Sequence, residues 1–300
     1  MSGDGVVFIG AGHGPADATR LKQQGAAALE RALGFVREHG DALSLLSSHV
    51  ALRAEPVGDL VERLAALQAD DGSYGPFDAP CRGWIGRELE AHGADPRLRG
   101  TLEALALLAD SHQTDAHCAE AAVRFVEAAQ QPDGSFGSRA ASATDDSSAV
   151  VVTGISAGSL GRSRYARPEG LVDAGSWLGE RFTPERVAQG HAAERAAFAM
   201  YYSNVPDEGA DGALQWCGRE LEREFRAHGF EALSVMQLLL ACQVGALPGA
   251  SFAPEELLER LLAEQAADGG FEALSADGPA ARVTSTIDAM RAVIGLCAIF

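Results

Sequence analysis

Three short stretches of this 300-residue chain share one pattern: ALQADDGSYG (66–75), AAQQPDGSFG (128–137) and AEQAADGGFE (263–272). Each contains a glutamine, then an Asp-Gly pair, then an aromatic residue. Glycine after a helix readily takes the left-handed conformation that ends it, and aspartate before glycine favours a turn. The three stretches therefore predict three helix-ending turns of one kind.

The spacing of these turns indicates an internal repeat. Gly72 and Gly134 are 62 residues apart, and Gly134 and Gly269 are 135 residues apart, about twice the first interval. We therefore expect a degenerate fourth copy in the second interval, and Asp211-Gly212 in EGADGALQW (208–216) is the candidate. Repeat units that cannot bury their own apolar faces must pack on their neighbours.

The segments on either side of the turns differ in character. Those before the turns carry apolar residues three and four apart and read as amphipathic helices: LVERLAALQ (60–68), CAEAAVRFVEAAQ (118–130) and EELLERLLAEQ (255–265). Other segments are apolar nearly all round and read as buried helices: 100–109, 147–158, 230–246 and 284–300. SSAVVVTG alone would suit a strand, but its place in the repeat favours a helix.

Further helical segments at 19–38, 41–54, 169–181 and 185–202 bring the expected total to about twelve helices. Alternating amphipathic and buried helices fit two concentric rings. The sequence therefore predicts an all-α fold, an (α/α)6 toroid of inner and outer helices. We expect residues 19–300 to form this single α/α barrel domain and residues 1–18 to form an extended arm.

The arm contains VVFIGAGHGPAD (6–17), which looks like a strand running into a glycine-rich dinucleotide loop. Pro15 takes the place of the third glycine, and no second strand ending in an acidic residue follows at the required distance. We therefore favour an arm packed on the barrel over a nucleotide-binding fold.

The turn phrase followed by a small, Ser/Thr-rich inner helix resembles the prenyltransferase/squalene-cyclase repeat, over roughly residues 56–300. That repeat occurs in class II terpene cyclases such as squalene–hopene cyclases, and in protein prenyltransferase β subunits. The resemblance implies an α/α barrel. It leaves the function to be argued from the site residues.

Composition narrows the classes of partner. A formal net charge of −18 argues against binding nucleic acid or an anionic membrane surface. Five dispersed cysteines without a CxxC pair suit a reduced, cytoplasmic chain, and the alanine-rich composition suggests a bacterial source. No apolar run is long enough to predict a transmembrane segment, and the acidic start does not read as a signal peptide.

Prenyltransferase β subunits hold zinc through residues that open their inner helices. The inner segments here open with TLEAL, TDDSSAV, FEALSV and TSTIDAM, without Cys or His at that point. A cluster of metal-ligating types, His112, Asp115, His117 and Cys118, instead starts an outer helix, where Asp115 suits a plain helix cap. We therefore expect no metal site.

Class II terpene cyclases use an acidic D-x-D-D-T/S motif that opens an inner helix, and its middle aspartate protonates the substrate. In SATDDSSAV (142–150), Ala143 replaces the first aspartate and Ser147 the threonine. The resemblance thus assigns Asp145 as the proton donor and Asp146 as its partner. The same residues also suit a helix cap. A dry site would keep the proton on Asp145, whereas the helix dipole favours the anion.

Aromatic faces stabilise carbocations, so Trp84, Phe198, Tyr201, Tyr202, Trp216 and Phe230 are candidates to line a substrate cavity, or else ordinary core residues. In the segment GRSRYARPEG (161–170), Arg162, Arg164 and Arg167 suit a diphosphate group, or form a solvated loop.

These observations predict a terpenoid cyclase-like lyase or isomerase that performs proton-initiated cyclisation or isomerisation of an isoprenoid or polyene, a hydrophobic small molecule. We expect no cofactor, with Mg²⁺ required only by a diphosphate substrate. Because such cyclases usually pair two barrels, a partner chain or homo-oligomer is expected to complete the site. The alternatives are a non-catalytic lipid- or peptide-binding barrel and a tailoring enzyme of secondary metabolism with a non-terpenoid substrate.

Overall fold

The computed structural model describes residues 15–75, 77, 83–137, 146–227, 229–272 and 278–299, and this part of the chain is all-helical without a β-strand. The all-α prediction is confirmed. The helices are α1 Pro15–His39, α2 Ala42–Ala51, α3 Val57–Leu67, α4 Trp84–Ala91, α5 Pro96–Asp110, α6 His117–Ala128, α7 Asp146–Gly161, α8 Pro168–Gly179, α9 Pro184–Gln189, α10 Ala192–Asn204, α11 Ala210–Arg226, α12 Ala232–Cys242, α13 Pro254–Ala263 and α14 Val283–Cys297. A short 3₁₀ helix, Pro279–Arg282, leads into α14.

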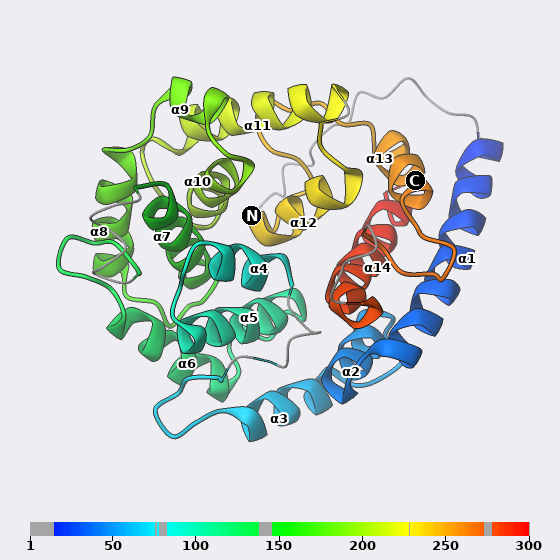
Figure 1. Cartoon of the computed structure of the whole chain (residues 1–300), viewed down its shortest axis with the longest axis horizontal. Helices are drawn as coiled ribbons and strands as arrows, with labels where there is room; N and C mark the ends of the chain where they lie inside the picture. Colours follow the sequence, from blue (N-terminus) through cyan, green and yellow to red (C-terminus); the bar gives the residue numbers. More distant parts are fainter. Residues whose placement is uncertain are drawn as a thin grey trace, which may run out of the picture.

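The helices separate into peripheral and interior ones. In Figure 1, α1, α3, α6, α8, α11 and α13 lie around the outside, while α5, α7, α10, α12 and α14 lie nearer the middle. Interior helices pack on one another in the order α7, α10, α12, α14, and α14 also packs on α2. Helix α7 is buried from Ser148 to Leu160, so SSAVVVTG is a helix, as its place in the repeat predicts.

The three repeated turns have one geometry. Gly72, Gly134 and Gly269 all have positive φ, at 85°, 90° and 91°. A Cβ atom at any of them would come within 2.3–2.5 Å of a carbonyl oxygen of a peripheral helix, on Ala121, Asp173 and Arg31 respectively. Glycine is therefore required twice over, by its φ and by the close approach of another backbone.

The glutamine of each turn joins it to a neighbouring peripheral helix. The side-chain amides of Gln68, Gln130 and Gln265 donate to the carbonyl oxygens of the glycines four residues later, at 2.8–3.0 Å. The same amides donate to carbonyls of the neighbouring helices, on Cys118 of α6, Gly170 of α8 and Ala28 of α1, at 2.7–3.0 Å.

The aromatic residue of each turn is held by a threonine of the interior helix that follows. The backbone N–H groups of Tyr74, Phe136 and Phe271 donate to the hydroxyl oxygens of Thr101, Thr153 and Thr286, at 2.9–3.0 Å. All three rings are buried. Each phrase thus ties a peripheral helix, the interior helix after it and a second peripheral helix together, which explains why the chain uses the phrase three times.

Four expectations need correction. Asp211-Gly212 does not form a helix-ending turn, because both residues lie within α11, near its start. The 135-residue interval between Gly134 and Gly269 had suggested a fourth copy there. Helices α4 and α11 were missed. The segment 185–202 is two helices, α9 and α10, separated near Gly190. Helix α1 starts at Pro15, so residues 15–18 are helical rather than extended; the rest of the arm lies outside the described residues.

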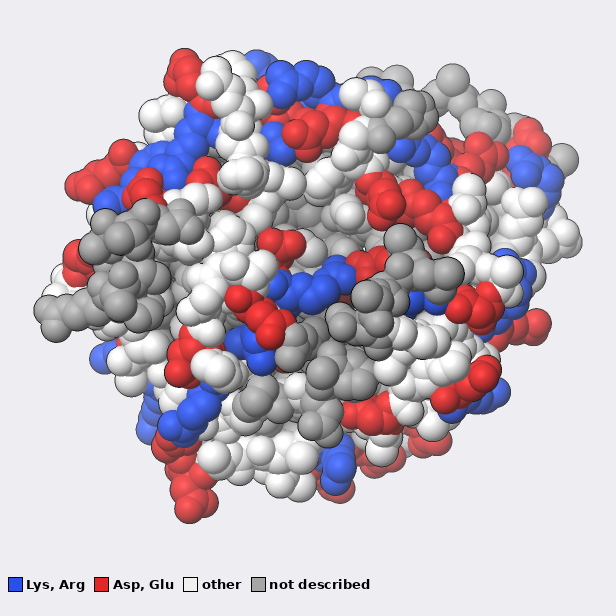
Figure 2. Space-filling model, in the orientation of Figure 1, with Lys and Arg blue, Asp and Glu red and all other residues white. Residues whose placement is uncertain are grey.

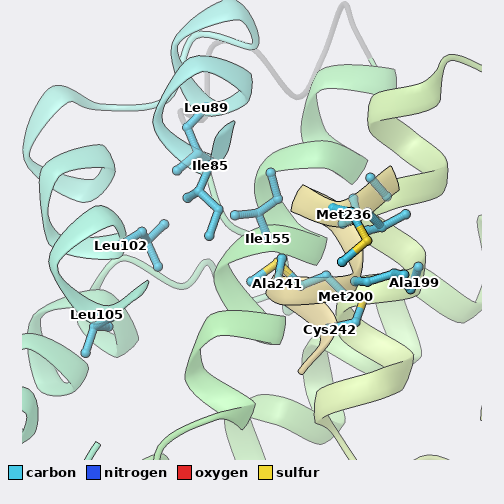
Figure 3. Close-up of a cluster of buried hydrophobic side chains, with 14 of the residues drawn as sticks. Ile85, Leu89, Leu102, Leu105, Ile155, Ala199, Met200, Met236, Ala241 and Cys242 are labelled. Carbon is cyan, nitrogen blue, oxygen red and sulfur yellow. The ribbon is translucent and has the colours of Figure 1, made fainter. Parts of the chain in front are cut away.

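Helices α7 and α10 approach closely through glycines. A Cβ atom at Gly154, Gly158 or Gly161 would lie 2.5–2.8 Å from backbone or side-chain atoms of α10 and its last turn. Figure 3 shows buried side chains from α4, α5, α7, α10 and α12 meeting in the interior, among them Ile85, Leu102, Ile155 and Met236. This apolar cluster fills one side of the interior, and a cavity lies beside it.

Candidate functional site

The cavity lies among the interior helices and contains about 770 Å³ of free space, part of it open to solvent. Its walls come from α2, α4, α5, α12 and α14, together with the C-terminal end of α7. Most of the wall is apolar: Leu43, Phe77, Trp84, Ile85, Ala106, Leu107, Leu240, Ala241 and Ile287. Its mostly apolar lining suits an apolar molecule.

A polar network faces this apolar wall. Arg162 Nη2 donates to Asp110 Oδ1 at 2.7 Å, and Arg291 Nη1 donates to Asp110 Oδ2 at 3.2 Å. Arg291 also reaches Asp288 Oδ1 at 3.4 Å. Gln237 Nε2 donates to the other oxygen of Asp288 at 3.0 Å. Two guanidinium groups thus balance two carboxylates contributed by α5 and α14.

The two carboxylates differ in environment. Burial raises the pKa of Asp288 to about 6; the Arg291 charge opposes this shift and the Asp110 charge adds to it. Asp110 is bound by two guanidinium groups, Arg162 and Arg291, whereas Asp288 has one. A carboxyl group with a pKa near 6 carries its proton in a measurable fraction of molecules near neutral pH, and a filled, dry cavity would increase that fraction.

Helix α4 lies across one side of the cavity and contributes Trp84 and Ile85 to its wall. The carboxylate of Glu103 on α5, which also lines the cavity, occupies the space where a side chain at Gly86 would stand. In Figure 1, α4 lies next to α5, above it in this view and near the middle of the molecule, and in Figure 2 acidic and basic side chains gather side by side there.

Two residues predicted to bind substrate line the cavity. Trp84 opens α4, and Arg162 stands at the end of α7 with 2% of its side chain exposed. The other two arginines of the segment 161–170 lie elsewhere. Arg164 is over the ring of Tyr165, and Arg167 pairs with Glu127 at 2.9 Å. Only the first of the three arginines is therefore positioned to contact a ligand in this cavity.

The other predicted aromatic residues pack away from the cavity. Phe198 and Tyr202 of α10 contact the ring of Phe182 edge to face, at centroid distances of 5.2 and 5.9 Å. The Tyr201 hydroxyl donates to the carbonyl of Leu171 at 3.1 Å. Trp216, on α11, lies beside Arg219. These residues hold interior helices to peripheral ones and do not line this cavity, nor does Phe230.

The predicted acid, Asp145, lies outside the described residues. Asp146 opens α7, and 55% of its side chain is exposed. Its carboxylate accepts from Arg181 Nε at 3.0 Å and from Arg186 Nη1 at 2.5 Å. Partial burial favours a higher pKa, but the hydrogen bonds from Arg186 and Arg181 outweigh it and lower the pKa. Asp146 is thus an ion-paired anion away from the cavity wall.

The cluster at 112–118 has no metal-binding geometry. Cys118 is fully buried, and the N-cap of α6 is Ala116 rather than Asp115, so the predicted cap is wrong. Across the described ranges, no group of three or more His, Cys, Asp or Glu side chains is placed to hold a metal ion. Within those ranges no helix combines the length and apolar character needed to cross a bilayer.

Asp110, Gln237, Asp288 and Arg291 were missed as site residues. Each stands within a mostly apolar helical segment, and the isolated charges of TSTIDAMRAV (284–293) are the signal that was available. A charge in a segment that is buried all round must find a partner there.

Comparison with known proteins adds no assignment: neither a protein-family model nor a curated protein matches this chain.

Proposed function

We propose that this chain is a terpenoid cyclase-like enzyme in which Asp288 donates a proton to an isoprenoid or other polyene held in the central cavity. The observation that carries the proposal is a carboxyl group with a pKa raised to about 6 in the wall of an apolar cavity. Acid catalysis needs a group that still holds its proton near the working pH.

The proposal includes a closed (α/α)6 toroid. In such a toroid the helices would follow one another as six peripheral–interior pairs, α1–α2, α3–α5, α6–α7, α8–α10, α11–α12 and α13–α14, with α4 and α9 as insertions. Two contacts support closure between the last hairpin and the first. Gln265, after α13, bonds the Ala28 carbonyl of α1, and α14 packs on both α1 and α2.

The chemistry follows from the arrangement of the polar network. Gln237 and Arg291 orient the Asp288 carboxyl group, while Arg162 and Arg291 bind the Asp110 carboxylate. Transfer of the Asp288 proton to a substrate double bond forms a C–H bond and leaves a carbocation. Cyclisation or migration moves that cation, and transfer of a proton from carbon, directly or through water, to the Asp288 carboxylate yields a neutral alkene and restores the acid. The Trp84 ring borders the cavity and suits a cation.

A hydrocarbon fits this cavity better than a diphosphate. Both lining arginines already bond the Asp110 carboxylate, so a phosphate group would have to compete with Asp110 for their N–H groups. We therefore propose a neutral polyene as the substrate, without a required Mg²⁺ ion.

The test is Asp288→Asn. Asparagine keeps the shape of the side chain and an oxygen that can accept the hydrogen bond from Gln237, but it has no acidic proton. Squalene-like polyenes and polyprenyl diphosphates are incubated with each protein, and products are separated by gas chromatography with mass detection. We expect roughly a 100-fold or greater loss of product formation. Asp173→Asn, on the exposed face of α8, is the matched control. Equal turnover by all three proteins would exclude Asp288 as the acid.

A non-catalytic lipid-binding barrel is the second candidate, because the apolar wall alone suffices for binding. Fluorescence titration with the same polyenes separates the two. Saturable binding by the wild type without any product would favour the binding module. Asp145→Asn belongs in the same series, since the resemblance assigns that residue as the acid.

A further inference from the structure

A serine, a histidine and a glutamate line up where the end of α4 meets the start of α7. Ser148 Oγ lies 2.9 Å from His92 Nδ1. The other ring nitrogen, Nε2, lies 3.9 Å from Glu88 Oε2. Glu88 and His92 are one helical turn apart, so they share a face of α4. Ser148 sits in the first turn of α7, the helix that α4 packs against at this end.

The order hydroxyl, imidazole, carboxylate is the one that activates a serine nucleophile. The imidazole accepts the hydroxyl proton on one nitrogen, and a carboxylate near the other nitrogen stabilises the imidazolium that forms. At 3.9 Å, Glu88 acts on the ring through its charge and not through a direct hydrogen bond. Burial raises the pKa of Glu88, and the charges of His92 and Arg87 oppose that shift. The carboxylate thus lies in a partly desolvated place, where its attraction for an imidazolium is stronger than in water.

The surroundings suit the charge that develops during attack. The first turn of a helix leaves backbone N–H groups without intrahelical acceptors, and its dipole favours negative charge. A tetrahedral oxyanion formed at Ser148 would lie at that end of α7. The histidine is accessible, with 19% of its side chain exposed.

Attachment of α4 does not depend on this contact. Near its start, Arg87 Nη1 donates to Ser285 at 3.1 Å and pairs with Glu272. Arg99 of α5 pairs with Glu90 at 3.1 Å. A His92–Ser148 hydrogen bond that only attached α4 to α7 would not need the Glu88 carboxylate near the imidazole ring.

We propose that Ser148, His92 and Glu88 form a nucleophilic site that hydrolyses small carboxylic esters. Ser148 Oγ attacks the ester carbonyl as His92 Nδ1 takes its proton. Collapse of the tetrahedral intermediate expels the alcohol, which takes that proton from His92. Water, deprotonated by His92, then attacks the acyl-serine, releases the carboxylic acid and restores the hydroxyl. His92 is about 12 Å along α4 from Trp84, at 1.5 Å per residue, and the three residues of this site are not among those that line the cavity.

The test uses a fluorophosphonate, which phosphonylates activated serines, followed by mass mapping of the modified peptide. We expect labelling at Ser148, no labelling at that position in Ser148→Ala, and at least a 100-fold lower labelling rate in His92→Gln. The glutamine can still accept a hydrogen bond from Ser148 but is no base, so it separates catalysis from tethering.

Ser156→Ala is the matched control, because Ser156 is buried on the same helix, eight residues after Ser148. It should label as the wild type does. Thermal melts of each variant check that the fold persists. Absence of labelling in the folded wild type, or an unchanged rate in folded His92→Gln, would overturn the proposal. Asp288→Asn should leave labelling intact, so failure of the cavity acid and failure of this site can be told apart.

Discussion

The pKa values of the aspartates in the repeated turns are lowered, whereas the pKa of the aspartate in the cavity wall is raised. The Ser73 hydroxyl, with Arg97, lowers the pKa of Asp71 to about 2. Hydrogen bonding to Ser135 lowers the pKa of Asp133, and to Arg282 that of Asp268. Burial instead raises the pKa of Asp288 to about 6. The same side chain is a fixed anion at the edge of the fold and an acid at its centre.

The difference lies in where the partners come from. Asp71 and Asp133 each bond a serine two residues later, and Asp268 bonds the backbone N–H of Gly270. Each of these partners lies two residues after its aspartate in the sequence. Asp288 depends on Gln237, Arg291 and Asp110, which reach it from α12, α14 and α5. The pKa values of Asp71 and Asp133 are therefore lowered mainly by a serine two residues later, and that of Asp268 by Arg282, whereas burial among several helices raises that of Asp288.

The largest effect should come from disrupting a turn. Gly134→Ala would place a methyl group 2.4 Å from the Asp173 carbonyl oxygen, at a φ of 90°. Left-handed strain of about 1–2 kcal/mol adds to overpacking of about 1–3 kcal/mol. We expect a loss of roughly 3 kcal/mol in the free energy of unfolding, measured by urea denaturation.

The control is Gly34→Ala, in the middle of α1, where a new Cβ meets no atom within 4 Å. Helix propensity alone should raise stability by roughly 0.5–1 kcal/mol there. Equal effects at the two glycines would contradict the distinction between them.

The second prediction concerns how the free energy of unfolding depends on pH through Asp288, in contrast to the turn aspartates. The unfolded chain protonates Asp288 near pH 3.8, whereas the folded protein protonates it near 6. Between these values the folded state binds more protons, so Asp288 stabilises the fold as pH falls from about 7 toward 4. Asp288→Asn should lose this gain, which amounts to roughly 3 kcal/mol at 1.4 kcal/mol per pKa unit.

The measurement is the difference in free energy of unfolding between wild type and variant, taken at intervals from pH 7.5 to pH 4. Asp133→Asn provides the opposite sign, because a lowered pKa gives stability that is lost as pH falls. Parallel curves for the two variants would show that Asp288 is not perturbed by burial.

A smaller effect is expected at the threonines behind the turns. Thr153 is fully buried, and its hydroxyl accepts the Phe136 N–H at 3.0 Å. Thr153→Val keeps the shape but leaves that donor without its acceptor, at a cost of about 1–3 kcal/mol in urea denaturation. Thr153→Ser restores the hydroxyl and should recover most of the loss. Equal losses in both variants would point to packing rather than the hydrogen bond.

The same contrast explains which features sequence reasoning could predict. The turns at Gly72, Gly134 and Gly269 were predictable, because three local copies signal one geometry. The fourth copy failed because the remaining hairpins use other connections. Helix α12, for example, is capped by the Glu264 carboxylate, which accepts from the N–H groups of Ala232 and Leu233. A cap supplied from another helix leaves no local pattern.

The candidate site was less predictable. Trp84 and Arg162 were found by residue type, but the aromatic cluster of α10 belongs to a helix contact, since Phe198 and Tyr202 pack on Phe182. Residue type alone does not tell which face of a helix meets a cavity. For Asp288 the sequence offers a charge in an apolar segment with Arg291 three residues later, while Gln237 and Asp110 come from other helices.

The smallest effect tests whether the ring is closed. Gln265→Ala removes the hydrogen bond to the Ala28 carbonyl of α1 and that to the Gly269 carbonyl. The glutamine is only half-buried, so a cost of about 1 kcal/mol is expected. Hydrogen exchange should become faster along α1 in this variant, because α1 loses a tie to α13. Gln68→Ala removes the equivalent bond to α6 and should speed exchange in α6 while leaving α1 unchanged. If α1 exchanges alike in both variants, Gln265 does not tie the last hairpin to the first, and the contact that supports a closed toroid loses its energetic basis.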